Sequence, residues 1–296
     1  MSITKAVLPV AGLGTRVLPA SKVVPKELLP LVDKPTLQYI VEEAVEAGIE
    51  EIIFVTSASK RAIEDHFDIF KELEQTLERK GKRKELEALR HVRTMATYAS
   101  VRQPEALGLG HAVLCAKKLV GDEPFVVMLG DDLVDPATPC LPRMLEMHEQ
   151  FGGSVLSLFS VPQHEISRFG IVSIEETASD SNAVKVTHMV EKPPVEEAPS
   201  NLAVAGRYIL TPDIFEILEK TPTGSGGEIQ LTDAIEVQAR EGRCYGLKFG
   251  GFGGIRYDTG TPLGLLTTSI AYALKRDDIA PALREYMHQV LEEEQR

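Results

Sequence analysis

A glycine loop followed by two separated cations is the first place in this sequence where chemistry is concentrated. Residues 9–35 read PVAGLGTRVLPASKVVPKELLPLVDKP, with Arg16 soon after the glycines and Lys26 ten residues later. Glycines after a buried strand expose backbone N–H groups with no Cβ in the way, which suits a phosphate or the edge of a base. The segment therefore predicts a site for an anionic ligand.

Two familiar nucleotide-binding loops are disfavoured by their own spacing. The dinucleotide fingerprint GxGxxG needs Gly or Ala at its sixth position, where this chain has Val17. It also needs an acid near the end of the second strand, and Asp33, although it has the right distance, lies ahead of the predicted helix and not after a second strand. The Walker pattern GxxxxGK[ST] fails because the sole Gly-Lys pair, at 81–82, is followed by Arg83.

Carboxylates at two later positions complete the set of reactive side chains. Asp131 follows the apolar run PFVVMLG, and a residue at the carboxyl end of a buried strand enters the crevice outside the sheet. Asp132 is the better candidate for a structural turn or capping residue. Asp258 lies in an Asp-Thr-Gly triplet, but an aspartic protease needs two such carboxylates sharing a proton. Only one triplet exists, so we reject that class.

The elements that must position these residues alternate in the first half of the chain. Apolar runs at 4–10, 50–57 and 124–132 predict buried strands, and 36–47 and 108–119 predict helices. Strand and helix in this order indicate a parallel sheet with helices on both faces.

A charged stretch at 70–90 has leucines at helical intervals and predicts a solvent-facing helical insertion. The second half has strand-like runs joined by short polar links, which predict antiparallel hairpins that extend the sheet. These runs lie at 153–161, 170–174, 183–190 and 201–210. Segments 212–220 and 228–241 predict helices, as does the tail from Pro262 onward, which is a possible assembly surface.

Composition excludes several classes of protein. The formal net charge is −12, which disfavours nucleic acid and anionic membranes as partners. No HExxH or GxSxG motif indicates a zinc protease or a serine hydrolase, and the three cysteines show no CxxC spacing. The chain shows no apolar leader near Met1 and no membrane-span pattern, so we expect a cytoplasmic protein.

The opening loop matches a third pattern, GxGTRxxPxxxxxPKxLLP, from Gly12 to Pro30. This pattern resembles the signature of the sugar nucleotidyltransferases, the NDP-sugar pyrophosphorylases. Further segments are similar to successive motifs of that family, in the same order: QPEALGLGHA (103–112), LGDDLV (129–134), FGIV (169–172), VEKP (190–193), GEIQLTDAI (227–235) and YDTGTPLG (257–264). The insertion and the GLGHAV segment resemble the bacterial branch that joins UTP to glucose 1-phosphate.

The resemblance implies a fold, a reaction and partners. The fold would be α/β: a Rossmann-like mixed, mostly parallel sheet flanked by helices, an added antiparallel sugar-binding part and a C-terminal helical segment. The reaction would be attack of glucose 1-phosphate on the α-phosphorus of UTP, giving UDP-glucose and pyrophosphate with Mg²⁺ as cofactor. Such transfer needs positioning and charge neutralisation more than acid–base groups. A homo-oligomer is expected.

Roles in the reaction follow residue by residue from the matched motifs. Arg16 and Lys26 would hold the triphosphate and stabilise the departing pyrophosphate, and Lys192 would bind the sugar phosphate. Asp131 and Asp258 would bind Mg²⁺, which takes one or two carboxylates besides waters and substrate phosphates.

Recognition of the base would fall to the loop backbone at Ala11 and Gly12 and to Gln103, with Gly108 allowing close approach. An amide offers both a donor and an acceptor, so it matches the edge of uracil. Thymine shows the same edge, so thymidylyl transfer stays an alternative activity.

The sugar would be held by Glu191, beside Lys192, and by the backbone of Gly170 and Val204. We expect a single nucleotidyltransferase domain over 1–296: a nucleotide-binding half at 1–135, a sugar-binding half at 136–260 and a helical segment at 261–296.

Two rival classes remain open. A catalytically silent regulatory relative would bind sugar nucleotides without turnover, but this sequence keeps the five charged side chains assigned to phosphate and metal. A nicotinamide-dependent oxidoreductase is disfavoured by Val17 and by the missing acid at the end of the second strand.

Overall fold

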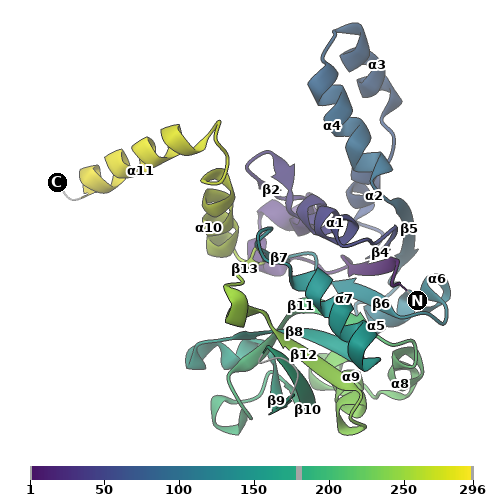
Figure 1. Ribbon diagram of the computed structural model, residues 1–296. Coiled ribbons are helices and arrows are strands. Elements are labelled where there is room, and N and C mark those ends of the chain that lie inside the picture. Colours follow the sequence, from purple (N-terminus) through teal and green to yellow (C-terminus); the bar gives the residue numbers. More distant parts are fainter. Residues whose placement is uncertain (1, 178–181, 295–296) are drawn as a thin grey trace.

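The protein folds around one large sheet, seen in a computed structural model that describes residues 2–177 and 182–294. Its strands lie in the order β5-β4-β1-β6-β11-β8-β12-β10-β9 (Figure 1). Their bounds are β1 Lys5–Pro9, β4 Glu51–Thr56, β5 Thr97–Arg102, β6 Phe125–Met128, β8 Ser154–Ser160, β9 Gly170–Glu176, β10 Ala183–Glu191, β11 Leu202–Leu210 and β12 Cys244–Lys248. The expected mixed α/β class is confirmed.

The N-terminal part of the sheet is parallel, as the alternating strand and helix pattern predicts. β1 pairs in parallel with β4 on one side and β6 on the other, and β4 pairs in parallel with β5. Numbered along the chain, these strands have the spatial order 3-2-1-4 of a dinucleotide-binding half. The Rossmann-like expectation therefore describes this part of the sheet.

The rest of the sheet does not keep that order, and the expected predominance of parallel pairing is wrong for the sheet as a whole. β11 runs antiparallel to β6 and β8, and β10 runs antiparallel to β12 and β9. Among the described residues of this part, β8 and β12 form the one parallel pair. A short link joins the consecutive strands β9 and β10, which makes that pair antiparallel, whereas the other antiparallel pairs bring together strands that are not consecutive in the chain.

Helices cover both faces of the sheet. They are α1 Thr36–Glu46, α2 Arg61–Phe67, α3 Lys71–Arg79, α4 Arg83–Thr94, α5 Leu109–Cys115, α6 Lys117–Val120, α7 Cys140–Phe151, α8 Ile214–Lys220, α9 Leu231–Arg240, α10 Pro262–Ala273 and α11 Ala280–Glu294. On one face α1 and α7 pack on Ala6 and Leu8 of β1, and on the other α5, α8 and α9 pack with Val7. This alternation follows from the two-residue period of a strand.

Two short two-stranded sheets lie outside the large sheet. β2 (Pro30–Leu31) pairs with β3 (Lys34–Pro35), and β7 (Asp132–Val134) pairs with β13 (Arg256–Asp258). The second pairing joins segments far apart in the sequence, and it carries both predicted metal-binding segments.

The predicted insertion at 70–90 is helical, and it forms the antiparallel pair α3 and α4 that projects from the body in Figure 1. Gly81, with φ +67°, lies in the turn between them. Glu74 of α3 accepts hydrogen bonds from Arg90 and Arg93 of α4 at 3.0 and 2.9 Å. The helices are therefore cross-linked by charge as well as by packing.

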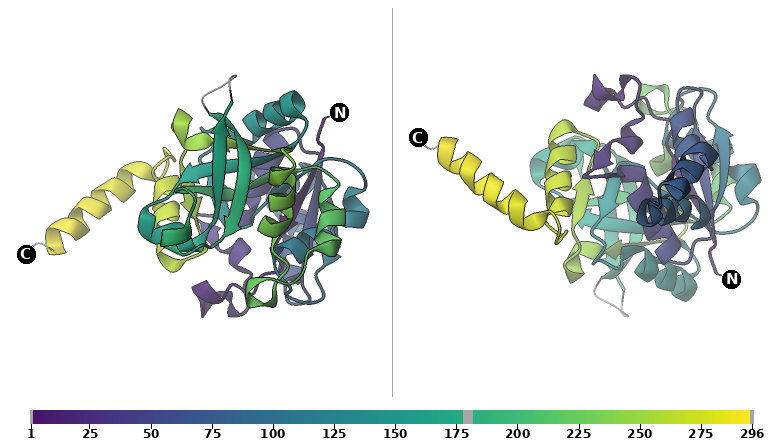
Figure 2. Two further views of the ribbon diagram at one scale, coloured as in Figure 1. Left: turned by 90° about the horizontal axis from the view of Figure 1, so that it is seen from below. Right: turned by 90° about the horizontal axis from the view of Figure 1, so that it is seen from above.

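The C-terminal tail is helical, as expected. α10 packs on β2 and β13, and α11 extends away from the body in both views of Figure 2. Tyr286 and Leu291 of α11 are exposed. Within 2–177 and 182–294, no helix combines the length and the apolar character needed to cross a membrane.

Candidate active site

The glycine loop lies where the direction of the strand connections changes. The chain leaves β1 toward β4, while β6 lies on the other side of β1. In open α/β sheets, ligands bind outside the carboxyl ends of the strands at such a switch point. Loop 10–14 after β1 and turn 129–131 after β6 both begin at this edge.

Asp131 is the point on which the two predicted phosphate cations converge. Lys26 Nζ lies 2.5 Å and Arg16 Nη2 3.7 Å from Asp131 Oδ2. Burial opposes the charged form of Asp131, but the positive charges of Lys26 and Arg16 outweigh it, so its pKa lies below the usual value. The predicted strand ends earlier than expected, at Met128, and Asp131 lies in the turn before β7.

Asp258 reaches Asp131 through the pairing of β13 with β7, which sets Asp258 opposite Asp132. The N–H and Oγ1 of Thr259 then donate to the Asp131 carbonyl at 2.9 and 3.0 Å. A Cβ added at Gly260 would lie 2.8 Å from Asp131 Oδ2 and 3.0 Å from Asp258 Oδ1. Both carboxylates therefore face the same point, and Gly260 leaves it accessible.

Asp132 has the structural role expected of it, although it lies in a strand and not at a helix cap. It is buried, and Arg256 donates to both of its oxygens from Nε at 3.0 and 2.9 Å. Gly206, with φ +42°, gives it room, because a Cβ there would lie 2.6 Å from the Asp132 Cβ. The ion pair of Asp132 with Arg256 therefore holds β7 and β13 together.

A buried ion pair lies beneath the loop that carries Lys26. Glu27 accepts a hydrogen bond from Lys60 Nζ at 2.7 Å, and the two residues are 1% and 5% exposed. Burial raises the pKa of Glu27 and lowers that of Lys60, so each charge depends on its partner. A Cβ at Gly130 would lie 2.9 Å from the Glu27 Cγ. Glu27 therefore packs under the turn that bears Asp131.

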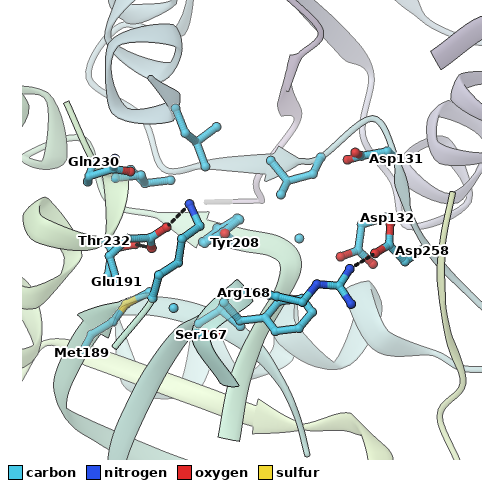
Figure 3. Close-up of a pocket in the computed structure, with 18 of the residues that line it drawn as sticks. Asp131, Asp132, Ser167, Arg168, Met189, Glu191, Tyr208, Gln230, Thr232 and Asp258 are labelled. Atoms are coloured by element: carbon cyan, nitrogen blue, oxygen red, sulfur yellow. Dashed lines mark hydrogen bonds and ion pairs between the residues drawn. The ribbon is translucent and has the colours of Figure 1, made fainter. Parts of the chain in front are cut away.

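One cavity of about 590 Å³ joins the two halves of the chain. Figure 3 shows Glu191 and Thr232 on one side of it, with Asp131, Asp132 and Asp258 on the other. The predicted site residues that line it are Arg16, Asp131, Gly170, Glu191, Lys192, Val204 and Asp258. The structure thus brings together the residues expected to bind phosphate, metal and sugar.

The sugar side is built at the end of β10. Glu191 accepts from Thr232 Oγ1 at 2.5 Å and pairs with Lys192 Nζ at 2.8 Å. Gly170 is its register partner on β9, where a Cβ would lie 3.3 Å from Glu191 Oε2. Lys192 has φ +45°, a left-handed backbone that a side chain with a Cβ adopts at a cost.

The predicted base-recognition residues lie at the same edge but do not line this cavity. Ala11 and Gly12 follow β1, and a Cβ at Gly12 would meet open space. Gln103 follows β5, and its amide nitrogen donates to the carbonyl of Gly108 at 3.0 Å. Leu109, next to Gly108, does line the cavity, so this group borders it.

The donor set fits a divalent cation. The charged lining comprises the cations Arg16, Arg168, Lys192 and Arg256 and the carboxylates Asp131, Asp132, Glu191, Glu228 and Asp258. Carboxylates outnumber cations, so two phosphorylated ligands would be repelled without added positive charge. Among the described residues no group of three or more His, Cys, Asp or Glu is placed to hold a metal. Two carboxylates suit Mg²⁺, which takes its other ligands from water and phosphates.

Arg168, Thr232 and Arg256 are among the cavity residues that escaped prediction from the sequence. Arg168 Nη2 lies 3.5 Å from Asp258 Oδ2, Thr232 fixes Glu191, and Arg256 fixes Asp132. Each lies within or directly beside a matched motif, so proximity to the motifs was a usable signal. Which partner each would contact could not be read from the sequence, because the pairings cross large sequence separations.

Comparison with known proteins places these residues in a family. The nucleotidyl transferase family profile matches residues 5–274. The chain belongs to the nucleotidyl transferase family. That match confirms the resemblance seen in the motifs, and it ends before α11.

Relatives within the nucleotidyl transferase family are similar over nearly the whole chain. UTP–glucose-1-phosphate uridylyltransferase of Bacillus subtilis (strain 168) is 49% identical over 293 residues, covering 99% of each chain. The UTP-bound UGPase from Acinetobacter baumannii superposes with a TM-score of 0.87 at 43% identity, covering 98% of this chain and 99% of that one. A UDP-glucose pyrophosphorylase complexed with UDP-glucose gives 0.83 at 43% identity, covering 93% and 100%.

Proposed function

We propose that this protein transfers the uridylyl group of UTP to glucose 1-phosphate, forming UDP-glucose and pyrophosphate. The observation that carries the proposal is one cavity lined by Arg16, the two facing carboxylates Asp131 and Asp258 and the sugar-side pair Glu191 and Lys192, with Lys26 bound to Asp131 at its edge. Relatives named for this activity match nearly the full length of the chain at 49% identity.

The chain's residues mainly neutralise charge in this reaction. An oxygen of glucose 1-phosphate attacks the α-phosphorus of UTP in line, and pyrophosphate leaves on the opposite side. The nucleophile needs no general base, because the second pKa of a phosphate monoester is about 6. Arg16 and Lys26, both held at Asp131, would bind the triphosphate and stabilise the charge of the departing pyrophosphate.

Asp131 and Asp258 would hold Mg²⁺, since their carboxylates face one point beside Gly260. When bound, the cation polarises phosphate oxygens and offsets their charge. Arg256 and Asp132 keep the two segments paired, so the geometry of the carboxylates is set before substrate arrives.

The sugar phosphate would be bound by Lys192 and the glucose hydroxyls by Glu191, with the backbone of Gly170 and Val204 shaping the pocket. Thr232 fixes one oxygen of Glu191. On this division, residues 1–135 form the nucleotide-binding half, 136–260 the sugar-binding half and 261–296 a helical segment of a single domain.

The base would lie against the loop at Ala11 and Gly12 and be recognised by Gln103, whose carbonyl partner Gly108 borders the cavity. The thymidylyl alternative rests on the shared edge of uracil and thymine. The uridylyl reading is favoured by the Acinetobacter baumannii relative, which is described as UTP-bound.

The proposal is tested by pyrophosphate release from UTP and glucose 1-phosphate in the presence of Mg²⁺. We expect release that requires both substrates and stops when the metal is chelated. Replacement of UTP by dTTP in the same assay measures the alternative. Tight binding of UDP-glucose with no release would instead support the silent regulatory relative.

Cellular location and assembly complete the proposal. We infer a cytoplasmic enzyme that works as a homo-oligomer. The extension of α11 from the body, with Tyr286 and Leu291 exposed, gives a surface suited to assembly.

A further inference from the structure

The amide of Gln103 has an orientation that its surroundings dictate. Its Nε2 lies 3.0 Å from the carbonyl oxygen of Gly108 and 3.2 Å from Nδ1 of His111. A carbonyl oxygen only accepts hydrogen bonds, so the end of the amide that faces Gly108 must be the NH₂ group. The opposite end, Oε1, is therefore the one that is turned away.

The histidine completes this arrangement. With one amide hydrogen given to Gly108, the other is available for Nδ1 of His111, which must then carry a lone pair. The ring hydrogen belongs on Nε2, which lies 3.9 Å from Sγ of Cys115, four residues later on α5. His111 is half-buried, so its ring is restricted.

The Gly108 carbonyl is itself fixed in place. Gly108 has φ +95°, and a Cβ there would lie 2.7 Å from Glu228 Cβ and 2.9 Å from the carbonyl oxygen of Ile229. Leu107 accepts from the N–H of Ile229 at 2.8 Å. The acceptor that selects the NH₂ end of Gln103 is thus tied to the segment before α9.

The free end of the amide can then select a base. In the part of the chain that the structure describes, no hydrogen bond reaches Oε1 of Gln103. Uracil and thymine carry a hydrogen on N3, whereas N3 of cytosine is an acceptor. An amide oxygen accepts from the former and repels the latter.

We propose that His111 is a specificity-determining positioning residue, which holds the Gln103 amide so that its oxygen selects bases with an N3–H over cytosine. The inference rests on the proposed function, because it assumes a nucleoside triphosphate at this edge. His111 acts through Gln103 and does not itself touch the base.

The test measures binding of UTP and CTP to the full-length protein with Mg²⁺ by isothermal titration calorimetry. The quantity of interest is the ratio of the two dissociation constants. His111→Leu removes the hydrogen bond between the amide and Nδ1. We expect the ratio of the CTP to the UTP dissociation constant to fall about tenfold. In His111→Asn, the side-chain oxygen can take the place of Nδ1, so most of the preference should return.

Two further variants distinguish the positioning of Gln103 by His111 from a general loss of structure. His111→Leu in a Gln103→Leu background should add no more than about a twofold change, because the residue that it positions is gone. His148→Leu removes a different histidine bond, the 2.8 Å contact to the Gly153 carbonyl, and should leave the ratio unchanged.

The outcomes distinguish the inference from the function. An unchanged UTP-to-CTP ratio in a folded His111→Leu protein overturns the role of His111 and leaves the proposed function standing. The role of His111 is also overturned if His111→Leu changes the UTP-to-CTP ratio equally in the presence of Gln103 and in the Gln103→Leu background. Absence of pyrophosphate release and of UTP binding in the unaltered protein would instead refute the proposed function.

Discussion

The two lysines assigned to phosphate binding sit in contrasting surroundings. Lys26 is 16% exposed and its ammonium is 2.5 Å from Asp131, whereas Lys192 is 54% exposed and pairs with Glu191 at 2.8 Å. Below Lys26 lies the buried Glu27-Lys60 pair, while Lys192 follows a strand end in a left-handed conformation. The side chain of Lys26 on the nucleotide side is thus held in place before substrate binds, whereas that of Lys192 on the sugar side can change position.

The largest expected effect lies on the nucleotide side. Asp131→Asn removes a charge from the point on which Lys26 and Arg16 converge and from the proposed metal site. We expect turnover to fall at least about 100-fold, with a modest fall in melting temperature because the contacts of the charged carboxylate with Lys26 and Arg16 are lost. Steady-state pyrophosphate release and a thermal melt check this.

The neighbouring carboxylate is the matched control. Asp132→Asn leaves Arg256 without its buried partner, so it should lower the melting temperature far more than Asp131→Asn does. Equal loss of stability in both variants, or normal turnover in Asp131→Asn, would contradict the assignment.

The buried pair offers the second test. Lys60→Met leaves Glu27 charged and unpaired in a site where burial already raises its pKa. We expect the free energy of unfolding to drop by about 3 kcal/mol, measured by urea denaturation. The double variant Glu27→Gln, Lys60→Met should recover part of this loss, and failure of any recovery would show that the pair does not act as a unit.

The sugar side should respond differently. Lys192→Ala should raise the KM for glucose 1-phosphate about tenfold or more, because one charged hydrogen-bonding group is lost, and should leave the KM for UTP nearly unchanged. Initial rates with each substrate varied in turn measure this. A selective rise in the KM for UTP would reverse the proposed division of the two lysines.

The smallest expected effect concerns the backbone of Lys192. At φ +45°, Gly is tolerated better than Ala, so Lys192→Gly should be more stable than Lys192→Ala by about 1 kcal/mol. Neither variant has the ammonium, so their difference reports on the backbone, where the strain of Ala at positive φ is opposed by the larger entropy that Gly loses on folding. Thermal unfolding of the two proteins side by side detects it, and equal stability would argue against strain at this position.

Much of the fold could be predicted from periodicity, because buried runs such as 4–10 and 50–57 are continuous and the amphipathic segment 36–47 lies between them. The strand order of the second half could not, since most of its paired strands are not consecutive in the chain and tertiary packing sets their order. The polar strand β5 has no fully buried residue, since its residues are either half-buried or exposed, and this gives a weak signal. α7 and β12 also escaped prediction.

The residues of the site could be predicted where they lie in recognisable sequence motifs. The cations, carboxylates and sugar-side residues chosen from motifs line one cavity or contact its lining. The meeting of Asp131 with Asp258 depends on the β7–β13 pairing across more than a hundred residues, which no local pattern specifies. The orientation of Gln103 depends likewise on the fold around Gly108.

The central claim is that Asp131 and Asp258 jointly hold the metal beside the phosphates. A crystal structure with glucose 1-phosphate, a non-hydrolysable UTP analogue and Mn²⁺, whose anomalous signal marks the metal, tests it most directly. We expect one metal that contacts an oxygen from each carboxylate and a phosphate oxygen. Lys26 and Arg16 should then bind the triphosphate, and Lys192 the sugar phosphate. A metal bound elsewhere, with the two carboxylates turned from the phosphates, would contradict it.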